Sequence, residues 1–282
     1  MQIEPLNFSH QRLLSSRLSK LNLGLSEHSF SNLYLFKKIH QYTLICIDDL
    51  VLIKGITRDK TPFIMPTAHP DENLYSALSH LILSPLILFP IPDEWLNCFS
   101  KRVVHSYYKE EDSDYIFAQK KIASYPGRHL DGKRNQVKQL LSQHEVMSEK
   151  FSHQIDDALY ILDSWEKDNR ERTQTDYSSC KEALLHFDSL NLKGCIVYVD
   201  KKPAGFILGE WSSKDYFSVH FSKGMRTIKG IYQYLFQEMA KSVEENCTWI
   251  NLEQDLGIPS LRASKLSYHP DLIKHKWRVE LK

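Results

Sequence analysis

Two carboxylates follow a short apolar segment near the C-terminal end of the chain. Glu253 and Asp255 come directly after the sequence TWINL at residues 248–252, whose composition predicts a strand. Open sheets place ligands at the carboxyl ends of strands, and a carboxylate there can act as general base toward an amine or a hydroxyl. We therefore expect Glu253 or Asp255 to be catalytic. The alternative for Asp255 is a structural cap on the helix that starts near Pro259.

Two cations follow these carboxylates on a predicted helix. Arg262 and Lys265 are three residues apart in the sequence SLRASKLSYHP, so they share one helical face. Paired cations suit a phosphate or a carboxylate, and we expect both residues to bind an anionic substrate. Tyr268 and His269 end the segment as further candidates, with a half-buried aromatic and a surface histidine as the structural alternatives.

A basic loop joins a predicted strand to a predicted helix at residues 222–230. It has the sequence SKGMRTIKG and contains Lys223, Arg226, Lys229 and Gly230. The free N–H groups and the dipole of a helix N-terminus favour an anion, so this loop is a candidate phosphate site. The alternative is an ordinary basic loop with glycine turns.

A third basic set lies near the middle of the chain. Lys133, Arg134 and Asn135 occur in the sequence GKRNQV at the start of a predicted helix. Their functional interpretation is an anion clamp, and their structural interpretation is a helix start stabilised by ion pairs.

The order of the predicted elements occurs twice. Residues 43–56 and 195–210 each predict a β-hairpin whose turn contains an aspartate, Asp48 or Asp200. Two helices precede each hairpin, and a third strand, a helix and a further strand follow it. This repetition predicts an α+β protein of two similar domains, each a mixed sheet flanked by helices, with a boundary near Ser142. The expected domains are residues 1–142 and residues 143–282, the second carrying the active site.

Charge and cysteine content exclude several classes of protein. The chain has 36 Lys and Arg against 35 Asp and Glu, so bulk charge predicts neither nucleic-acid nor membrane binding. Local excesses of positive charge occur at residues 116–150 and 261–282. The five cysteines are widely spaced and include no CxxC pair, which favours a reducing, cytoplasmic location and predicts no metal site.

The most hydrophobic segment is too short to cross a membrane. It runs from residue 81 to 91, contains two prolines, and falls short of the roughly 20 apolar residues that a spanning helix needs. We expect no integral membrane insertion.

Longer segments of the chain resemble one known family. The sequence NLEQDLGIPSLRASKLSYHP (251–270) is similar to a signature of the phosphatidylglycerol lysyltransferase C-terminal-like family. The segments at 26–36, 114–135, 190–210 and 219–240 fit the same family in order. Members carry a histidine just before the KRN triplet, where this chain has Asp131 three residues before Arg134.

The resemblance implies two tandem GNAT-like domains, the acyl-CoA N-acyltransferase type of fold. It further implies Tyr268 as general acid and the 222–230 loop as the holder of donor phosphates. The GNAT phosphate motif is incomplete here, since Thr227 and Tyr232 occupy motif positions around Gly230. We therefore expect that acetyl-CoA is not the preferred donor.

These observations favour an acyl- or aminoacyltransferase. The expected donor is anionic, either aminoacyl-tRNA or an acyl-CoA, with an amine or hydroxyl as acceptor and no other cofactor. The alternatives are a non-catalytic module that retains the GNAT-like fold and a peripheral binder of anionic lipid. Fold by itself does not decide among them.

Overall fold

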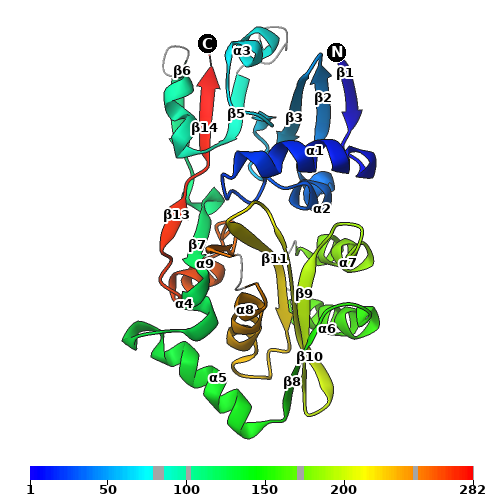
Figure 1. Cartoon of the computed structure of the whole chain (residues 1–282), viewed down its shortest axis with the longest axis vertical. Coiled ribbons are helices and arrows are strands. Elements are labelled where there is room, and N and C mark those ends of the chain that lie inside the picture. The colour runs from blue at the N-terminus through cyan, green and yellow to red at the C-terminus, as the bar shows by residue number, and fades with distance from the viewer. Residues whose placement is uncertain (79–85, 100–102, 170–174, 244–246, 282) are drawn as a thin grey trace. The chain divides into compact units, whose positions relative to one another are not determined.

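The computed structural model describes residues 1–282 except 79–85, 100–102, 170–174, 244–246 and 282. Its strands form two sheets, and its contacts divide the chain into two compact units (Figure 1). Unit 1 comprises Met1–Tyr115, Glu253–Lys265 and Leu272–Lys282, and unit 2 comprises Ile116–Leu252 and Leu266–Asp271.

The sheet of unit 1 has seven strands in the order β1-β2-β3-β4-β5-β14-β6. All neighbouring pairs are antiparallel except β4 and β5, which pair in parallel. The helices of this unit are α1 (Gln11–Leu18), α2 (Phe30–His40), α3 (Glu72–Leu78) and most of α9 (Pro259–Leu266). The strands are β1 (Gln2–Pro5), β2 (Thr43–Ile47), β3 (Leu50–Ile56), β4 (Pro62–Pro66), β5 (Leu86–Ile91), β14 (Trp277–Leu281) and β6 (Val103–Tyr108), and β13 (Leu272–Lys274) leads into β14.

The strands of unit 2 repeat this arrangement in the order β7-β12-β11-β10-β9-β8, and β11 and β12 form the parallel pair. In Figure 1, α8 lies on one side of this sheet and α6 and α7 lie on the other. The strands are the greater part of β7 (Asp114–Ala118), of which residues 116–118 belong to this unit, and β12 (Trp249–Asn251), β11 (Tyr216–Gly224), β10 (Lys202–Trp211), β9 (Lys193–Val199) and β8 (Val146–Lys150). The helices are α4 (Gln119–Ser124), α5 (Asp131–Gln143), α6 (Ile155–Lys167), α7 (Tyr177–Leu185) and α8 (Ile231–Ser242).

The two predicted hairpins are confirmed, and so is the α+β class. Asp48 and Asp200 both lie in the tight turns with φ of +49°. Aspartate tolerates this left-handed conformation better than most residues, which explains why it occurs at both turns. In each unit the hairpin is followed by an antiparallel strand, a helix and a parallel strand, in the predicted order.

The cores follow the predicted apolar patterns. Along α8 and its C-cap Val243, the apolar residues Ile231, Leu235, Met239 and Val243 recur every four residues, about one turn, and all four side chains are buried. The core of unit 1 centres on Leu52 and the side chains from β4, β5 and β14 around it. Burial of these alternating side chains fixes the register of each strand.

The structure divides the chain differently from the expected boundary at residues 142 and 143. Strand β14, from the C-terminal end, lies between β5 and β6 in unit 1, while β7, from the first half, lies beside β12. Each sheet is therefore completed by a strand from the other half of the sequence. As a consequence, residues 253–265 belong to unit 1, although they were expected to belong to a C-terminal domain.

No helix in the described part of the chain is long and apolar enough to cross a membrane. Within the segment 81–91, residues 86–91 form β5, and residues 81–85 lie outside the described residues.

Candidate active site

The backbone leaves β12 through an unusual conformation. Glu253 and Leu256 have φ of +58°, and Gly257 has φ of +71°. The left-handed region is unfavourable for residues with a side chain and costs on the order of 1–2 kcal/mol each. Residues held in this way cluster at functional sites, so the segment 253–257 is the starting point for the site.

Asp255 binds Arg262, which follows it by seven residues on α9. The Arg262 Nε donates to Asp255 Oδ2 at 2.6 Å and its Nη2 donates to Oδ1 at 3.2 Å. Tyr115 and the backbone N–H of Gly257 also donate to this carboxylate, at 2.7 and 2.8 Å. The Asp255 side chain is fully buried, whereas that of Arg262 is 34% exposed. Asp255 therefore holds one end of the guanidinium, and Nη1 at the other end lies 3.5 Å from the exposed carboxylate of Glu110.

These contacts set the charge state of the pair. Burial opposes ionisation of Asp255, but the hydrogen bonds from Arg262, Tyr115 and Gly257 hold its pKa below the usual value. Burial and the bond to Asp255 raise the pKa of Tyr115 to about 12. Asp255 is thus an ionised acceptor with its lone pairs engaged, which makes it a poor general base and a good orienting group for Arg262.

Lys265 stabilises the same segment from the other side. Its Nζ donates to the carbonyl oxygens of Glu253 at 2.8 Å and Gln254 at 2.6 Å, and its side chain is buried. Burial lowers the pKa of Lys265 to about 8, against the opposing effect of the Glu253 carboxylate. Arg262 and Lys265 therefore both lie on α9 as predicted. Of these two cations, Lys265 is buried and Arg262 is partly exposed.

A buried charged cluster lies next to this segment in unit 1. Lys276 Nζ is 2.7 Å from Asp114 and from Glu27, and it donates to Ser26 Oγ at 2.8 Å and Gln254 Oε1 at 2.9 Å. Ser26 donates its backbone N–H to Asp114 at 2.7 Å. The side chains of Lys276 and Asp114 are fully buried. Burying these three charges costs hydration free energy. The short ion pairs and the additional hydrogen bonds of the cluster offset that cost.

The cluster perturbs its own members and a neighbouring histidine. Burial raises the pKa of Glu27 to about 7, although Lys276 opposes this. Burial would lower the pKa of Lys276, but the two carboxylates raise it above the ordinary value. Burial, and then Lys276, lower the pKa of His28 to about 3, and neither ring nitrogen of His28 has a hydrogen-bond partner among the described residues.

Glu253 begins the segment 253–257 and is held by helix α2. Its carboxylate accepts a hydrogen bond from Asn32 Nδ2 at 3.1 Å, and its side chain is buried. The α2 helix positions Asn32, because Ser29 caps its N-terminus by accepting from the Asn32 N–H at 3.1 Å. Chemically, unit 1 therefore offers a partly exposed guanidinium and a buried carboxylate. No three His, Cys, Asp or Glu side chains among the described residues gather as a metal site requires.

The cations of the 222–230 loop lie in unit 2, and most of them are engaged internally. Lys223 is buried, pairs with Asp176 at 2.7 Å, and lies 3.6 Å from the centre of the Trp165 ring. Arg226 donates to the carbonyl of Asp168 at 3.1 Å, and Lys229 is exposed. Burial and pairing of Lys223 favour the structural interpretation for this residue.

Gly230 serves close packing between helices in unit 2. It has φ of +87°, and a Cβ at this position would lie 2.5 Å from the carbonyl oxygen of Gln136 in α5. The close approach of α5 to the start of α8 therefore explains why this position is a glycine, without a bound phosphate.

We expect Gly230→Ala to lower the free energy of unfolding by about 1–2 kcal/mol for the left-handed backbone, plus a further loss for the clash. Gly127→Ala is the matched control, because Gly127 has φ of +76° and a Cβ added there would meet no atom within 4 Å. Urea denaturation of both variants separates the two effects. Equal losses in the two variants would contradict a packing role for Gly230.

The KRN triplet at the start of α5 is also paired. Arg134 forms an ion pair with Asp131 and donates to the carbonyl of Tyr125. Lys133 donates to Ser267 at 2.6 Å, and Asn135 is exposed. Asp131 stands where family members carry a histidine, and in this chain it is the ion-pair partner of Arg134.

Tyr268 and His269 follow α9 in unit 2. Tyr268 is 1% exposed and packs against Tyr125, Phe117 and Phe236, and burial raises its pKa. His269 is exposed, has φ of +53°, and its ring lies 5.3 Å from that of His129. The surroundings of Tyr268 are those of a core aromatic residue, which favours its structural interpretation.

Sequence reasoning missed most of the buried cluster. Ser26, Glu27 and Asp114 lie in segments that carried the family resemblance, yet no local spacing distinguishes them as a group. Lys276 had no signal at all, because its partners are between 22 and 250 residues away along the chain. Only the path of β14 into unit 1 brings Lys276 to them.

Comparison with known proteins identifies the family. The family described as phosphatidylglycerol lysyltransferase, C-terminal, matches residues 19–280. An uncharacterized protein of Mycoplasmoides gallisepticum is 23% identical over 196 residues, which is 67% of this chain and 61% of that protein. The chain therefore spans about three fifths of the length of that relative.

Solved structures show the fold. A conserved protein of unknown function from Bacteroides thetaiotaomicron has a TM-score of 0.90 at 24% identity, with 100% of both chains covered. L-PGS from Bacillus licheniformis has a TM-score of 0.64 at 14% identity, covering 99% of this chain and 93% of that chain. The predicted tandem GNAT-like acyltransferase fold is confirmed. With its family match spanning residues 19–280, the chain belongs to the phosphatidylglycerol lysyltransferase C-terminal family.

Proposed function

We propose that this protein transfers an aminoacyl or acyl group from an activated ester or thioester to an amine or hydroxyl acceptor. The family and its aminoacyltransferase-like fold support the reaction class. The observation that carries the proposal is the geometry of Arg262, whose guanidinium is oriented by buried Asp255 and whose side chain is 34% exposed. An anionic ligand would displace the exposed Glu110 carboxylate, which lies 3.5 Å from Nη1. Such a group binds a phosphate or carboxylate with little loss of side-chain freedom.

Each residue of the site has a separate role in this proposal. Arg262 binds an anionic group of the donor, for which aminoacyl-tRNA is the first candidate and an acyl-CoA the second. The acceptor attacks the activated carbonyl and its proton passes to the Glu253 carboxylate. The bond to the donor oxygen or sulfur then breaks, and the proton on Glu253 is returned to that atom, so that the donor leaves as an alcohol or thiol. Asn32 orients Glu253 through its 3.1 Å hydrogen bond. We propose the cytoplasm as the place of this reaction.

Asp255 is a positioning residue in this scheme. Its carboxylate already accepts hydrogen bonds from Arg262, Tyr115 and Gly257, and its pKa lies below the usual value. An occupied, strongly acidic carboxylate does not take a proton from an amine or hydroxyl efficiently. Glu253 is therefore the better candidate for the base, which narrows the two possibilities that the sequence left open.

We expect Arg262→Ala to lower the transfer rate at limiting donor concentration by at least tenfold, with the fold retained. The assay supplies a pool of tRNAs charged with labelled amino acids, or labelled acyl-CoA, together with anionic phospholipid vesicles or primary amines. Transfer of label to the acceptor is the readout. Asp255→Asn should reduce transfer through a weaker donor affinity, because it releases the guanidinium from its fixed orientation.

Arg128→Ala is the matched control, since Arg128 is an exposed arginine of unit 2 outside the proposed site. It should leave transfer unchanged. Equal activity of Arg262→Ala and the parent protein would contradict the assignment of Arg262. Unfolding of Arg262→Ala, seen by circular dichroism, would instead make Arg262 a structural partner of Asp255.

A second candidate function is a binding module that retains the fold without turnover. The observation that favours it is that Asp255 and Lys265 already form hydrogen bonds with groups of the protein itself. In this case no donor would yield labelled product. A donor or anionic vesicles would still bind to the protein, and Arg262→Ala would weaken that binding.

A further inference from the structure

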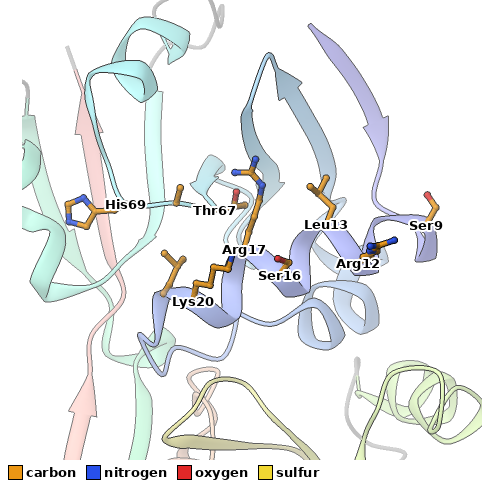
Figure 2. A pocket seen from close by; sticks show the side chains of 10 residues that line it. Ser9, Arg12, Leu13, Ser16, Arg17, Lys20, Thr67 and His69 are labelled. Atoms are coloured by element: carbon orange, nitrogen blue, oxygen red, sulfur yellow. The ribbon is translucent and has the colours of Figure 1, made fainter.

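A basic groove runs along α1 in unit 1, separate from the residues of the proposed transfer reaction. It has a volume of about 770 Å³ and is bounded by α1, the turn after it, and the segment 67–69 that follows β4. Figure 2 shows the labelled side chains spread along the helix from Ser9 to Lys20, with Thr67 and His69 on the facing segment. The groove is open to solvent, so it suits a ligand that lies along the helix rather than one enclosed on all sides.

The sequence of α1 explains why its outer face is basic. His10, Leu14 and Leu18 recur every four residues and are buried. The remaining positions of the helix therefore face outward, and residues 9, 12, 13, 16, 17, 20 and 21 form a stripe with spacings of three and four. This stripe places Arg12, Arg17 and Lys20 over eight residues, or about 12 Å at the helical rise.

The positive charge of this groove is oriented but not neutralised. Arg17 donates to the backbone carbonyl of Asp49 at 2.7 Å, and His69 Nδ1 lies 3.1 Å from the carbonyl of Pro70. Within the described residues, no carboxylate forms an ion pair with Arg12, Arg17 or Lys20. The lining also contains no aspartate or glutamate side chain. Cations arranged in this way attract an anion, because nothing in the protein competes for them.

We propose that this groove binds the phosphates of a nucleotide, carried either by a free nucleoside polyphosphate or by an RNA strand. Charges spread over about 12 Å suit several phosphates in a row better than one isolated phosphate. The hydroxyls of Ser9 and Ser16 and the imidazole of His69 provide polar and flat surfaces beside the cations.

The groove does not have the composition of a membrane-binding face. Such a helix needs a broad apolar surface, and Leu13, at 38% exposure, is the one strongly exposed apolar side chain of the described lining. Anionic lipid is the alternative ligand, and the experiment therefore includes vesicles of it. The proposal does not depend on the transferase assignment, since binding is measured without donor or acceptor.

The test compares two double variants of the full chain. Arg12→Ala/Lys20→Ala removes two exposed cations of the groove that form no ion pair within the described residues. Lys38→Ala/Lys54→Ala removes two exposed cations of unit 1 away from it. Binding of a short fluorescein-labelled single-stranded RNA is followed by anisotropy, binding of ATP by calorimetry, and binding of phosphatidylglycerol vesicles by sedimentation.

We expect Arg12→Ala/Lys20→Ala to weaken RNA or ATP binding at least tenfold, with no effect in the control. For RNA, the slope of log affinity against log salt should fall by about 1.4, because each phosphate contact on a single strand contributes about 0.7. Effects on RNA alone identify a strand as the ligand, and effects on ATP as well identify a free nucleotide. Equal losses in the two double variants, binding of vesicles only, or no binding of either nucleotide probe would overturn the proposal.

Discussion

Replacing Lys276 with methionine should lower the free energy of unfolding by about 3–5 kcal/mol. The change removes the cation that lies 2.7 Å from Asp114 and from Glu27, and it leaves both carboxylates buried without a counter-charge. Removal of one partner from a buried ion pair has this magnitude, because the remaining charge has lost its hydration as well. Urea denaturation at pH 7 measures the loss.

Acidity should stabilise the Lys276→Met variant. Burial already raises the pKa of Glu27 to about 7 in the folded protein, well above the 4.5 of the free side chain, and loss of Lys276 raises it further. The folded state then binds a proton that the unfolded state does not, so the stability of Lys276→Met should increase as the pH falls from 7 toward 4.5.

Two further variants test the electrostatic explanation. Lys38→Met is the surface control and should change stability little, since Lys38 is exposed on α2. The triple variant Lys276→Met/Glu27→Gln/Asp114→Asn keeps the shape of the cluster without its charges and should recover part of the loss. A triple variant as unstable as Lys276→Met would attribute the loss to packing.

His28→Phe should make the protein more stable than the parent at pH 4, by about 3 kcal/mol. Burial lowers the pKa of His28 to about 3 in the folded state, against 6.5 for the free side chain. Between pH 6.5 and pH 3, His28 therefore binds a proton in the unfolded state but not in the folded state. As the pH falls from 6.5 to 3, His28 removes stability from the parent at about 1.4 kcal/mol per pH unit.

At pH 7 the two proteins should have similar stability, or the variant should be slightly more stable. In the part of the chain that the structure describes, neither ring nitrogen of His28 has a hydrogen-bond partner, so phenylalanine leaves no new unsatisfied group there. His153→Phe is the control, because His153 is exposed and should not alter the pH profile. Parallel stability curves for His28→Phe and the parent between pH 7 and pH 4 would refute the burial effect.

The repeated fold was accessible from the sequence because its signals are local. A hairpin requires two apolar strands and a turn residue that accepts a positive φ, and Asp48 and Asp200 satisfy this at the same φ of +49°. The stripe of α8 requires only a period near 3.6 residues. Patterns of this length are set by neighbouring residues, so they appear without knowledge of the rest of the chain.

Part of the candidate site was accessible for the same reason. Asp255 and Arg262 are seven residues apart, so one turn and one helix suffice to bring them together. The sequence also indicated that Lys265 shares a face with Arg262. It did not indicate that Lys265 points inward to the carbonyls of Glu253 and Gln254, because burial depends on what packs against the helix.

The sequence by itself determined the two repeated hairpins, the α+β class, the family and the placement of Arg262 and Lys265 on one helical face. Only the tertiary structure decided which residues share a unit. The exchange of β7 and β14 between the halves places Lys276 beside Ser26, 250 residues away, and transfers Glu253 and Arg262 to unit 1. Strand exchange leaves no mark in composition or periodicity, since β14 satisfies the same alternating pattern in either sheet. Its choice of partner depends on long-range packing, which no local window of sequence contains.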